Sequence, residues 1–180
     1  MPTDINLQNC EKRSPHKYKE GDVYTGEWRK GTQIWEGRGV LAYASGETYE
    51  GYWRDGNRHG YGRNICPDGD CYEGQYKNGL QHGHGVYEWA DGERYEGEYK
   101  DDMSNGRGKY TWPDLGHYEG EWKDDNMHGR GKYNFFASGN SYEGEWKENM
   151  VYGEGIFTYK DGRQEKRKYE TSVATPSIDI

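Results

Sequence analysis

Three histidines, His59, His82 and His128, recur in the same local sequence, each directly before a Gly-x-Gly segment. Imidazole is a common zinc ligand, so this recurrence raises the question of a metal site. If each copy lies on its own β-hairpin, neighbouring copies stand two strands apart, roughly 9.6 Å. A zinc ion needs its ligands at about 2 Å, so these side chains cannot share one ion. We therefore predict that the histidines are turn residues and that no metal is bound.

Pairs of glutamates separated by one residue could supply the acid and the base of a catalytic site. The pairs are Glu96/Glu98, Glu119/Glu121 and Glu143/Glu145. Catalytic carboxylates need burial or a cleft that changes their pKa. These glutamates alternate with aromatic residues, so in a strand they occupy the opposite, solvated face. We expect cross-strand pairing with Lys100, Lys123 or Lys147, and we predict no catalytic residue and no enzymatic activity.

The repeated Gly-x-Gly segments do not predict phosphate or dinucleotide binding. Such a site needs a third glycine and a following helix whose N-terminus faces the phosphate, and neither is present. Cys66 and Cys71 flank a Pro-Asp-Gly turn, and Cys66 occupies a position where other repeats have an aromatic ring. We interpret Cys66 as a small hydrophobic residue, since no activating partner is nearby. No cofactor is predicted.

The elements that carry these residues follow from an internal repeat. Six segments begin with Tyr-x-Gly and have Trp or Tyr two residues later, and the leading tyrosines are Tyr24, Tyr49, Tyr72, Tyr95, Tyr118 and Tyr142. Counting the leading tyrosine as position 1, residues at positions 1, 3 and 5, and again at 14, 16 and 18, repeat with the spacing of two that is typical of strands. Turn dipeptides such as Asp55-Gly56 and Asp91-Gly92 lie between them. Each repeat is therefore predicted to be a β-hairpin.

One face of the predicted sheet is aromatic. Positions 1, 5, 16 and 18 make 24 places in six repeats, and 21 hold Tyr, Trp or Phe. The exceptions, Leu41, Asn64 and Cys66, predict looser packing in the first two repeats. Glycines at positions 3 and 14 leave space in which a neighbouring ring can lie flat. The twist of the sheet should curve this face into a trough.

Composition restricts the class of partner. The 180 residues include 18 Tyr, 7 Trp and 28 Gly, and the net charge is −8. This charge disfavours nucleic acid and anionic membranes as partners. No apolar run is long enough for a transmembrane helix, and the first residues do not resemble a signal peptide. Three cysteines fit a reducing compartment, so we expect a cytoplasmic protein.

The repeated unit Tyr-Glu-Gly-Glu-Trp-Lys-x-Gly…His-Gly-x-Gly-x-Tyr-x-Tyr-x-Asp-Gly resembles the MORN repeat (membrane occupation and recognition nexus). The resemblance divides the chain into an N-terminal tail (1–20), a repeat array (21–162) and a C-terminal tail (163–180). The six repeats are 24–48, 49–71, 72–94, 95–117, 118–141 and 142–162. It implies an all-β fold, an elongated single-layer antiparallel sheet of stacked β-hairpins in a solenoid-like trough. It also implies a scaffold in a cytoskeletal assembly, including the axoneme of a cilium or flagellum.

The main hypothesis is therefore a non-enzymatic scaffold that holds a helical or extended segment of a partner protein in the aromatic groove. The residues predicted to line this groove are Tyr24, Trp28, Tyr49, Trp53, Tyr72, Tyr76, Tyr87, Trp89, Tyr95, Tyr99, Tyr110, Trp112, Tyr118, Trp122, Tyr133, Phe135, Tyr142, Trp146, Phe157 and Tyr159. The alternative is a peripheral membrane adaptor that binds anionic phospholipid, which only the family name and the basic segment 163–168 favour.

The two ends of the array leave further questions open. Open sheets have unpaired edge strands, so edge-to-edge self-association is an alternative to a monomer. The basic C-terminal tail could cover its own edge or dock on an acidic partner. Residues 171–180 are expected to be extended or disordered. The sequence alone does not choose between these alternatives.

Overall fold

The computed structural model describes residues 5–174, which are almost entirely β-strand and form two compact units. Among the described residues, unit one contains 5–90 and 100–102, and unit two contains 91–99 and 103–174. A single turn of 3-10 helix, η1 (Leu7–Asn9), precedes the first strand. Nowhere in residues 5–174 is there a helix of the length and apolarity that a membrane crossing requires.

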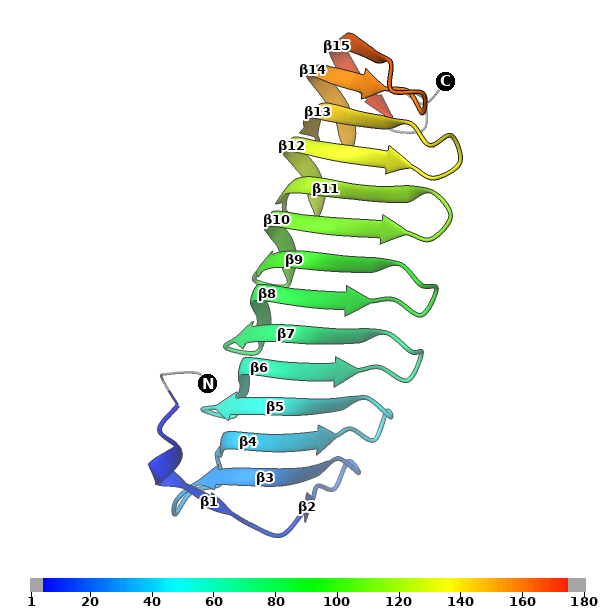
Figure 1. The fold of residues 1–180 in the computed structure, drawn as a ribbon. Coiled ribbons are helices and arrows are strands. Elements are labelled where there is room, and N and C mark those ends of the chain that lie inside the picture. Colours follow the sequence, from blue (N-terminus) through cyan, green and yellow to red (C-terminus); the bar gives the residue numbers. More distant parts are fainter. Residues whose placement is uncertain (1–4, 175–180) are drawn as a thin grey trace. The chain divides into compact units, whose positions relative to one another are not determined.

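Unit one is an antiparallel sheet whose neighbouring strands are also neighbours in the chain (Figure 1). Its strands are β1 (Cys10–Lys12), β2 (His16–Lys17), β3 (Val23–Arg29), β4 (Trp35–Ala42), β5 (Thr48–Arg54), β6 (Asn57–Ile65), β7 (Cys71–Lys77) and β8 (Leu80–Glu88). The exception to chain order is β2, which pairs with β3 beside β1. Each of the first three repeats contributes one hairpin, so β3–β4, β5–β6 and β7–β8 are the hairpins of this unit.

Unit two repeats the same arrangement. Its strands are β9 (Arg94–Lys100), β10 (Met103–Trp112), β11 (Gly116–Lys123), β12 (Asn126–Phe135), β13 (Ser141–Lys147), β14 (Met150–Thr158) and β15 (Gln164–Ala174). All of them pair antiparallel in chain order. The predicted fold class, an all-β antiparallel sheet built from stacked hairpin repeats, is thereby confirmed.

In repeats two to six the turn inside the hairpin has positive φ at two consecutive residues. Asp55-Gly56 and Asn78-Gly79 adopt this conformation as predicted, with φ of 51° and 78° in the first pair. Later repeats adopt the same turn without glycine, at Asp101-Asp102, Asp124-Asp125 and Glu148-Asn149. Asn and Asp tolerate this left-handed region better than other residues, which explains most of these replacements.

These glycine-free turns are also bonded to the preceding repeat. The N–H of Asp125 donates to the carbonyl of Ser104 at 3.1 Å, and its Oδ1 accepts from the N–H of Ser104 at 2.7 Å. Asn149 makes the same pair of hydrogen bonds with Met127. The side chain thus completes a backbone ladder between consecutive turns, which a glycine in that place could not do.

A β-bulge interrupts the second strand of each hairpin at position 12. The glycine there has positive φ in every repeat, from 58° at Gly129 to 97° at Gly106. The pairing register shifts beside it, for example between Gly120 and Glu121. Gly120 pairs with Gly131 but Glu121 pairs with His128, so Gly129 and Arg130 are two extra residues and the faces of the strand are the same on both sides of the bulge. This shift was not predicted. It places the residue at position 10 opposite the position-5 ring, as Met127 is opposite Trp122.

The strand boundaries show that the prediction of the recurrent histidines as turn residues was wrong. His59, His82 and His128 lie inside strands β6, β8 and β12, directly before the bulge glycine. The turn ends earlier because the second strand of each hairpin begins at about position 9 rather than at position 14, as at Asn57 and Asn126.

Each leading tyrosine lies across two glycines, as the sequence predicts. The glycines at positions 3 and 14 are direct cross-strand partners, for example Gly120 and Gly131. A methyl group at Gly131 would lie only 2.2 Å from the hydroxyl of Tyr118. The same hydroxyl donates to the carbonyl of Glu121 at 3.0 Å. Because only a hydrogen atom fits beneath the ring, this pattern explains why glycine recurs at both positions.

Segments outside the six repeats cover both ends of the array. At the C-terminus β15 pairs with β14, which shows that residues 164–174 of the tail cover their own edge. Tyr169 occupies the place of a position-5 ring and meets Tyr142 edge-on with centroids 6.0 Å apart. Arg167 stands where a repeat has its first glycine, and its guanidinium covers Phe157 at 3.8 Å. The predicted disorder or extension of residues 175–180 lies outside the described residues.

Candidate functional site

Most of the rings predicted to line the groove form the core of the sheet itself. Side chains with at most 7% of their surface exposed are Tyr24, Trp28, Tyr49, Trp53, Tyr72, Tyr76, Tyr95, Tyr99, Tyr118, Trp122, Tyr133, Phe135, Tyr142, Trp146 and Phe157. Within a repeat the rings at positions 1 and 5 meet edge-on, as Tyr118 and Trp122 do with centroids 5.3 Å apart. Burial leaves these rings almost no surface for a partner, so their role is to support the face.

Three of the four position-5 indole nitrogens are bonded within the protein, whereas that of the buried Trp28 has no partner among the described residues. Trp53 donates to the carbonyl of Gly39 at 3.2 Å, and Trp146 donates to the carbonyl of Gly131 at 3.0 Å. In both cases the acceptor is the position-14 glycine of the preceding repeat. The position-5 tryptophans therefore join consecutive repeats by packing and by a hydrogen bond. Their N–H groups are not available to a ligand.

The accessible part of the predicted groove in unit one is the pair Tyr87 and Trp89. Both rings are half-buried, and their centroids lie 4.5 Å apart at a tilt of 38°. The hydroxyl of Tyr87 donates to Oδ2 of Asp70 at 2.9 Å. Burial, followed by this hydrogen bond, raises the pKa of Tyr87 well above its ordinary value. The ring is thus held neutral and in a fixed orientation.

Unit two presents the same arrangement at Tyr110 and Trp112. Their centroids lie 4.4 Å apart, and the hydroxyl of Tyr110 donates to Oε2 of Glu93. Burial and then this hydrogen bond raise the pKa of Tyr110. Tyr159 is the remaining half-buried ring of the predicted set, and its hydroxyl donates to Glu165 of β15 at 2.8 Å. Each unit therefore offers half-exposed rings whose hydroxyls are anchored by carboxylates.

Position 10 adds residues to the aromatic face that were not predicted to lie there. Trp35 stacks on Tyr24 with centroids 4.7 Å apart, whereas Met127 and Val151 are buried. The period of two could have identified them, because position 10 lies on the same face as positions 14, 16 and 18 when the alternation is continued toward the turn. The prediction began the second strand at position 14 and so stopped short of position 10.

In repeat two the residue at position 10 is a cation. Arg58 donates to the hydroxyl of Tyr43 and to Glu47, both at 3.2 Å, and to Asn64 at 3.3 Å. Its guanidinium also lies over the ring of Tyr49, 5.2 Å from the centroid. Asn64 and Cys66 are the places where this repeat lacks rings. Arg58 occupies the space beside them, so these replacements do not leave the predicted loosely packed region.

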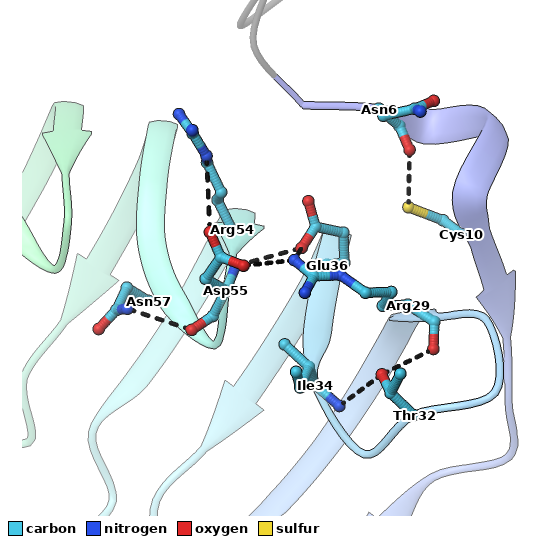
Figure 2. A network of polar contacts seen from close by, with 9 residues as sticks. All are labelled: Asn6, Cys10, Arg29, Thr32, Ile34, Glu36, Arg54, Asp55 and Asn57. Carbon is cyan, nitrogen blue, oxygen red and sulfur yellow. Dashed lines mark hydrogen bonds and ion pairs between the residues drawn. The ribbon is translucent and has the colours of Figure 1, made fainter.

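Position 11 links each repeat to the turn of the next. In repeat one the buried Glu36 accepts from the N–H of Asp55 at 3.1 Å and from Arg29 at 2.7 Å, and Arg29 also binds the Asp55 carboxylate (Figure 2). The hydrogen bond from Arg29 holds the pKa of Asp55 below its usual value. His59 takes the same place in repeat two and accepts from the N–H of Asn78 at 3.5 Å. His59 thus serves a structural contact, and residues 5–174 contain no cluster of His, Cys, Asp and Glu that could hold a metal ion.

Glutamates on the reverse face bind the bulge backbone rather than lysine side chains. Oε1 of Glu98 accepts from the N–H of Arg107 at 3.0 Å, and Oε1 of Glu121 accepts from the N–H of Arg130 at 3.1 Å. The expected pairing of these two carboxylates with lysines is thus replaced by a backbone hydrogen bond. The reason is the bulge, which turns a main-chain donor away from the strand ladder.

A family model described as MORN repeat matches residues 24–48, 49–71, 72–94, 95–116, 118–139 and 142–162. No curated protein matches the chain in sequence. Among solved structures, the chain is similar to the TCP domain of SAS-4 from Drosophila melanogaster, solved in complex with a proline-rich motif of Ana2. That likeness has a TM-score of 0.53 at 11% identity and covers 92% of this chain and 87% of that chain. At this identity it shows a common fold alone.

Two further solved structures resemble the chain much less. Virginiamycin B lyase from Staphylococcus aureus has a TM-score of 0.23 at 12% identity and covers 93% of this chain and 73% of that chain. The G-box domain of the microcephaly protein CPAP has a TM-score of 0.24 at 16% identity and covers 89% of this chain and 100% of that chain. TM-scores this low do not support a structural comparison with this chain.

Proposed function

Because the chain belongs to the MORN-repeat family, with six tandem repeats between residues 24 and 162, we propose that it is a non-enzymatic scaffold that binds a segment of a partner protein. The observation that carries this proposal is the half-exposed ring pair in each unit, Tyr87 with Trp89 and Tyr110 with Trp112. Tyr and Trp supply large contact areas at low entropic cost and are enriched where proteins bind each other.

The chemistry of these rings favours an extended segment rich in proline or other apolar residues. Such segments already hold a polyproline II conformation and dock on grooves lined by aromatic side chains. The ring orientations are fixed by Asp70 and Glu93, so little order has to be gained on binding. The TCP domain that shares the fold was solved with a proline-rich motif of its partner, which supports this choice over a helix.

The same proposal places the protein in the cytoplasm, within a cytoskeletal assembly such as the axoneme of a cilium or flagellum. This placement rests on the family resemblance and on the cysteine usage, and on no particular residue of the structure. Fluorescence microscopy of the tagged chain in ciliated cells tests it. Even distribution through the cytosol, without enrichment on microtubule structures, would contradict the placement.

The binding proposal is tested with matched tyrosine substitutions in both units. Tyr87→Ser with Tyr110→Ser removes one ring of each half-exposed pair, and we expect a loss of the proteins that co-purify with the unmodified chain. Tyr152→Ser removes an exposed ring from the reverse face, 41% exposed, and should leave capture unchanged. Circular dichroism confirms that both variants fold. Equal capture by both variants would refute a partner site on the aromatic face.

The alternative, binding of anionic phospholipid, draws on the basic segment 163–168. In the structure most of this segment lies in β15, where Arg167 pairs with Glu165 at 3.3 Å, while Arg163 in the preceding turn pairs with Asp161 at 2.7 Å. These pairs reduce the positive charge available to a lipid surface. Flotation of the chain with acidic liposomes at physiological salt is the test, and we expect no binding.

A further inference from the structure

In four of the six bulges a side-chain oxygen accepts a hydrogen bond from the same backbone N–H. The N–H at position 13 donates to the side chain at position 4, and the bonds join Arg38 to Glu27 at 2.7 Å, His84 to Gln75 at 2.9 Å, Arg107 to Glu98 at 3.0 Å and Arg130 to Glu121 at 3.1 Å. Three of the four acceptors are carboxylates. Charge-assisted bonds of this type are among the stronger ones in proteins. The bulge N–H is therefore a donor that this chain repeatedly matches with a carboxylate.

Repeat two lacks this internal acceptor. Its residue at position 4 is Tyr52, and the corresponding donor is the N–H of Tyr61, beside the bulge glycine Gly60 with φ of 67°. In the part of the chain that the structure describes, no side chain accepts from this N–H. The Tyr52 ring instead lies 5.5 Å from the guanidinium of Arg38. The phenol of Tyr61 is turned away toward Glu73, to which it donates at 2.6 Å.

A cavity of about 700 Å³ opens at this bulge, on the reverse face of unit one. Its lining includes the bulge itself together with Arg54, His59, Lys77 and His82, and it contains no Asp or Glu. Acidic groups stand beside the lining: Asp55 lies 3.7 Å from Arg54, Asp101 lies 3.4 Å from His82, and Glu73 accepts from the phenol of Tyr61. In a chain of net charge −8, a cavity lined by cationic and imidazole groups is complementary to an anion.

We propose that this cavity, the repeat-two cavity, binds a carboxylate of an acidic segment of a partner protein. The carboxylate takes the place that Glu27, Glu98 and Glu121 occupy in their own repeats and accepts the N–H of Tyr61. Lys77 and Arg54 supply the surrounding positive charge, and the exposed ring of Tyr61 offers an apolar wall for the partner backbone. This site is separate from the aromatic face, so it does not depend on the function proposed above.

The backbone donor provides a direct readout. The ¹⁵N-labelled full chain is titrated with acetylated and amidated tetraglutamate, and with the matching tetraglutamine as the uncharged control. We expect a saturable shift of the Tyr61 amide resonance with tetraglutamate, because a charged acceptor strongly deshields the proton it binds. The amides of Arg107 and Arg130, which already have internal acceptors, should not move.

Filling the site from within tests the same assignment by substitution. Tyr52→Glu restores the carboxylate that the other repeats have, and we expect tetraglutamate binding to weaken at least about tenfold, since the donor is then occupied. Thr25→Glu adds the same charge to an exposed place on the same face of unit one and should change affinity little. Thermal unfolding of both variants establishes that they fold.

Four outcomes would overturn the proposal. The first is a Tyr61 amide that does not respond to tetraglutamate in the unmodified chain. The second is an equal response to tetraglutamine, which would remove the need for charge. The third is an equal loss of binding in Tyr52→Glu and Thr25→Glu, which would show long-range repulsion instead of competition for one donor. A response to inorganic phosphate without any response to tetraglutamate would equally reject a carboxylate ligand.

Discussion

The leading tyrosine and its two glycines form the smallest unit on which the sheet depends. The ring of Tyr118 covers Gly120 and Gly131, and its hydroxyl reaches the carbonyl of Glu121. The same arrangement recurs in the other repeats with small changes. Because ring, glycines and carbonyl belong to one hairpin, each repeat contains the contacts that determine its own local packing.

Replacing a covered glycine should therefore be very costly. In Gly131→Ala the new methyl group would lie 2.2 Å from the Tyr118 hydroxyl and would displace the ring. We expect a loss of about 3 kcal/mol or more in the free energy of unfolding, the range of severe overpacking. Gly162→Ala is the control, since that glycine has φ of 88° but nothing within 4 Å. Chemical denaturation of both variants gives the comparison, and a loss in Gly131→Ala no larger than that in Gly162→Ala would contradict a special cost of the ring contact.

The hydroxyls of the leading tyrosines are not equivalent. Tyr118 donates to Glu121, whereas the buried hydroxyl of Tyr142 is without a hydrogen-bond partner among the described residues. Tyr118→Phe should thus cost about 1 kcal/mol, the usual value of one buried hydrogen bond. Tyr142→Phe should be neutral or slightly stabilising, because no bond is lost and a polar group leaves the core. A comparable loss in both variants, measured by denaturant unfolding, would contradict this assignment.

Contacts between consecutive turns decide how one hairpin is joined to the next. In unit one this contact is the group of Arg29, Glu36 and Asp55 (Figure 2). Farther along the chain, turn side chains bond to the preceding repeat through their carboxylate or amide oxygen, as Asp125 does. The turn edge is therefore held by polar groups, whereas the aromatic face is held by ring packing.

This turn contact predicts a loss of stability in acid. Arg29 lowers the pKa of Asp55 below its ordinary value near 3.8, so folding favours the ionised carboxyl. The stabilisation is fully present above pH 3.8 and is lost as the pH falls through the pKa of the folded state. The melting temperatures of the unmodified chain and of Asp55→Asn should differ at neutral pH and converge in acid. Asp114→Asn, in an exposed turn of unit two, is the control, and a constant difference across the pH range would exclude the linkage.

At the scale of the whole molecule, the segments beyond the six repeats protect the open edges. β1 and β2 lie along β3, and β15 lies along β14. β15 follows the register of a further repeat, with Tyr169 in a ring position, but it has Arg167 where a glycine would admit the next ring. Its exposed Lys166 and Lys168 disfavour the addition of another strand.

Removing β15 should therefore cause self-association. A chain ending at Gly162 leaves the edge of β14 and the ring of Phe157 uncovered, and repeat arrays without a terminal cap tend to associate. We expect a concentration-dependent increase in mass in sedimentation velocity experiments and a lower melting temperature. A chain that lacks only residues 175–180 keeps β15 and is the matched control. A monomeric shortened chain with unchanged melting would show that β15 has no protective role.

The amino-acid sequence by itself determined the number of repeats, the hairpin in each of them and the face that carries the rings. These features follow from local rules, because a period of two assigns faces and Asp-Gly or Asn-Gly favours the positive φ of a tight turn. The place of the tyrosine ring over its glycines was likewise predictable, since both glycines belong to the same hairpin as the ring.

Only the tertiary structure decided which of those rings a partner can reach. Burial of Trp53 or Trp146 depends on the preceding repeat, and the two-residue bulge sets the register that pairs Arg58 with Trp53 and Met127 with Trp122. The pairing of β15 with β14 is a contact of the same kind, between a repeat and the segment that follows it. A local pattern specifies the direction in which a side chain points. The residues that this side chain contacts lie about 23 positions away, one repeat earlier or later.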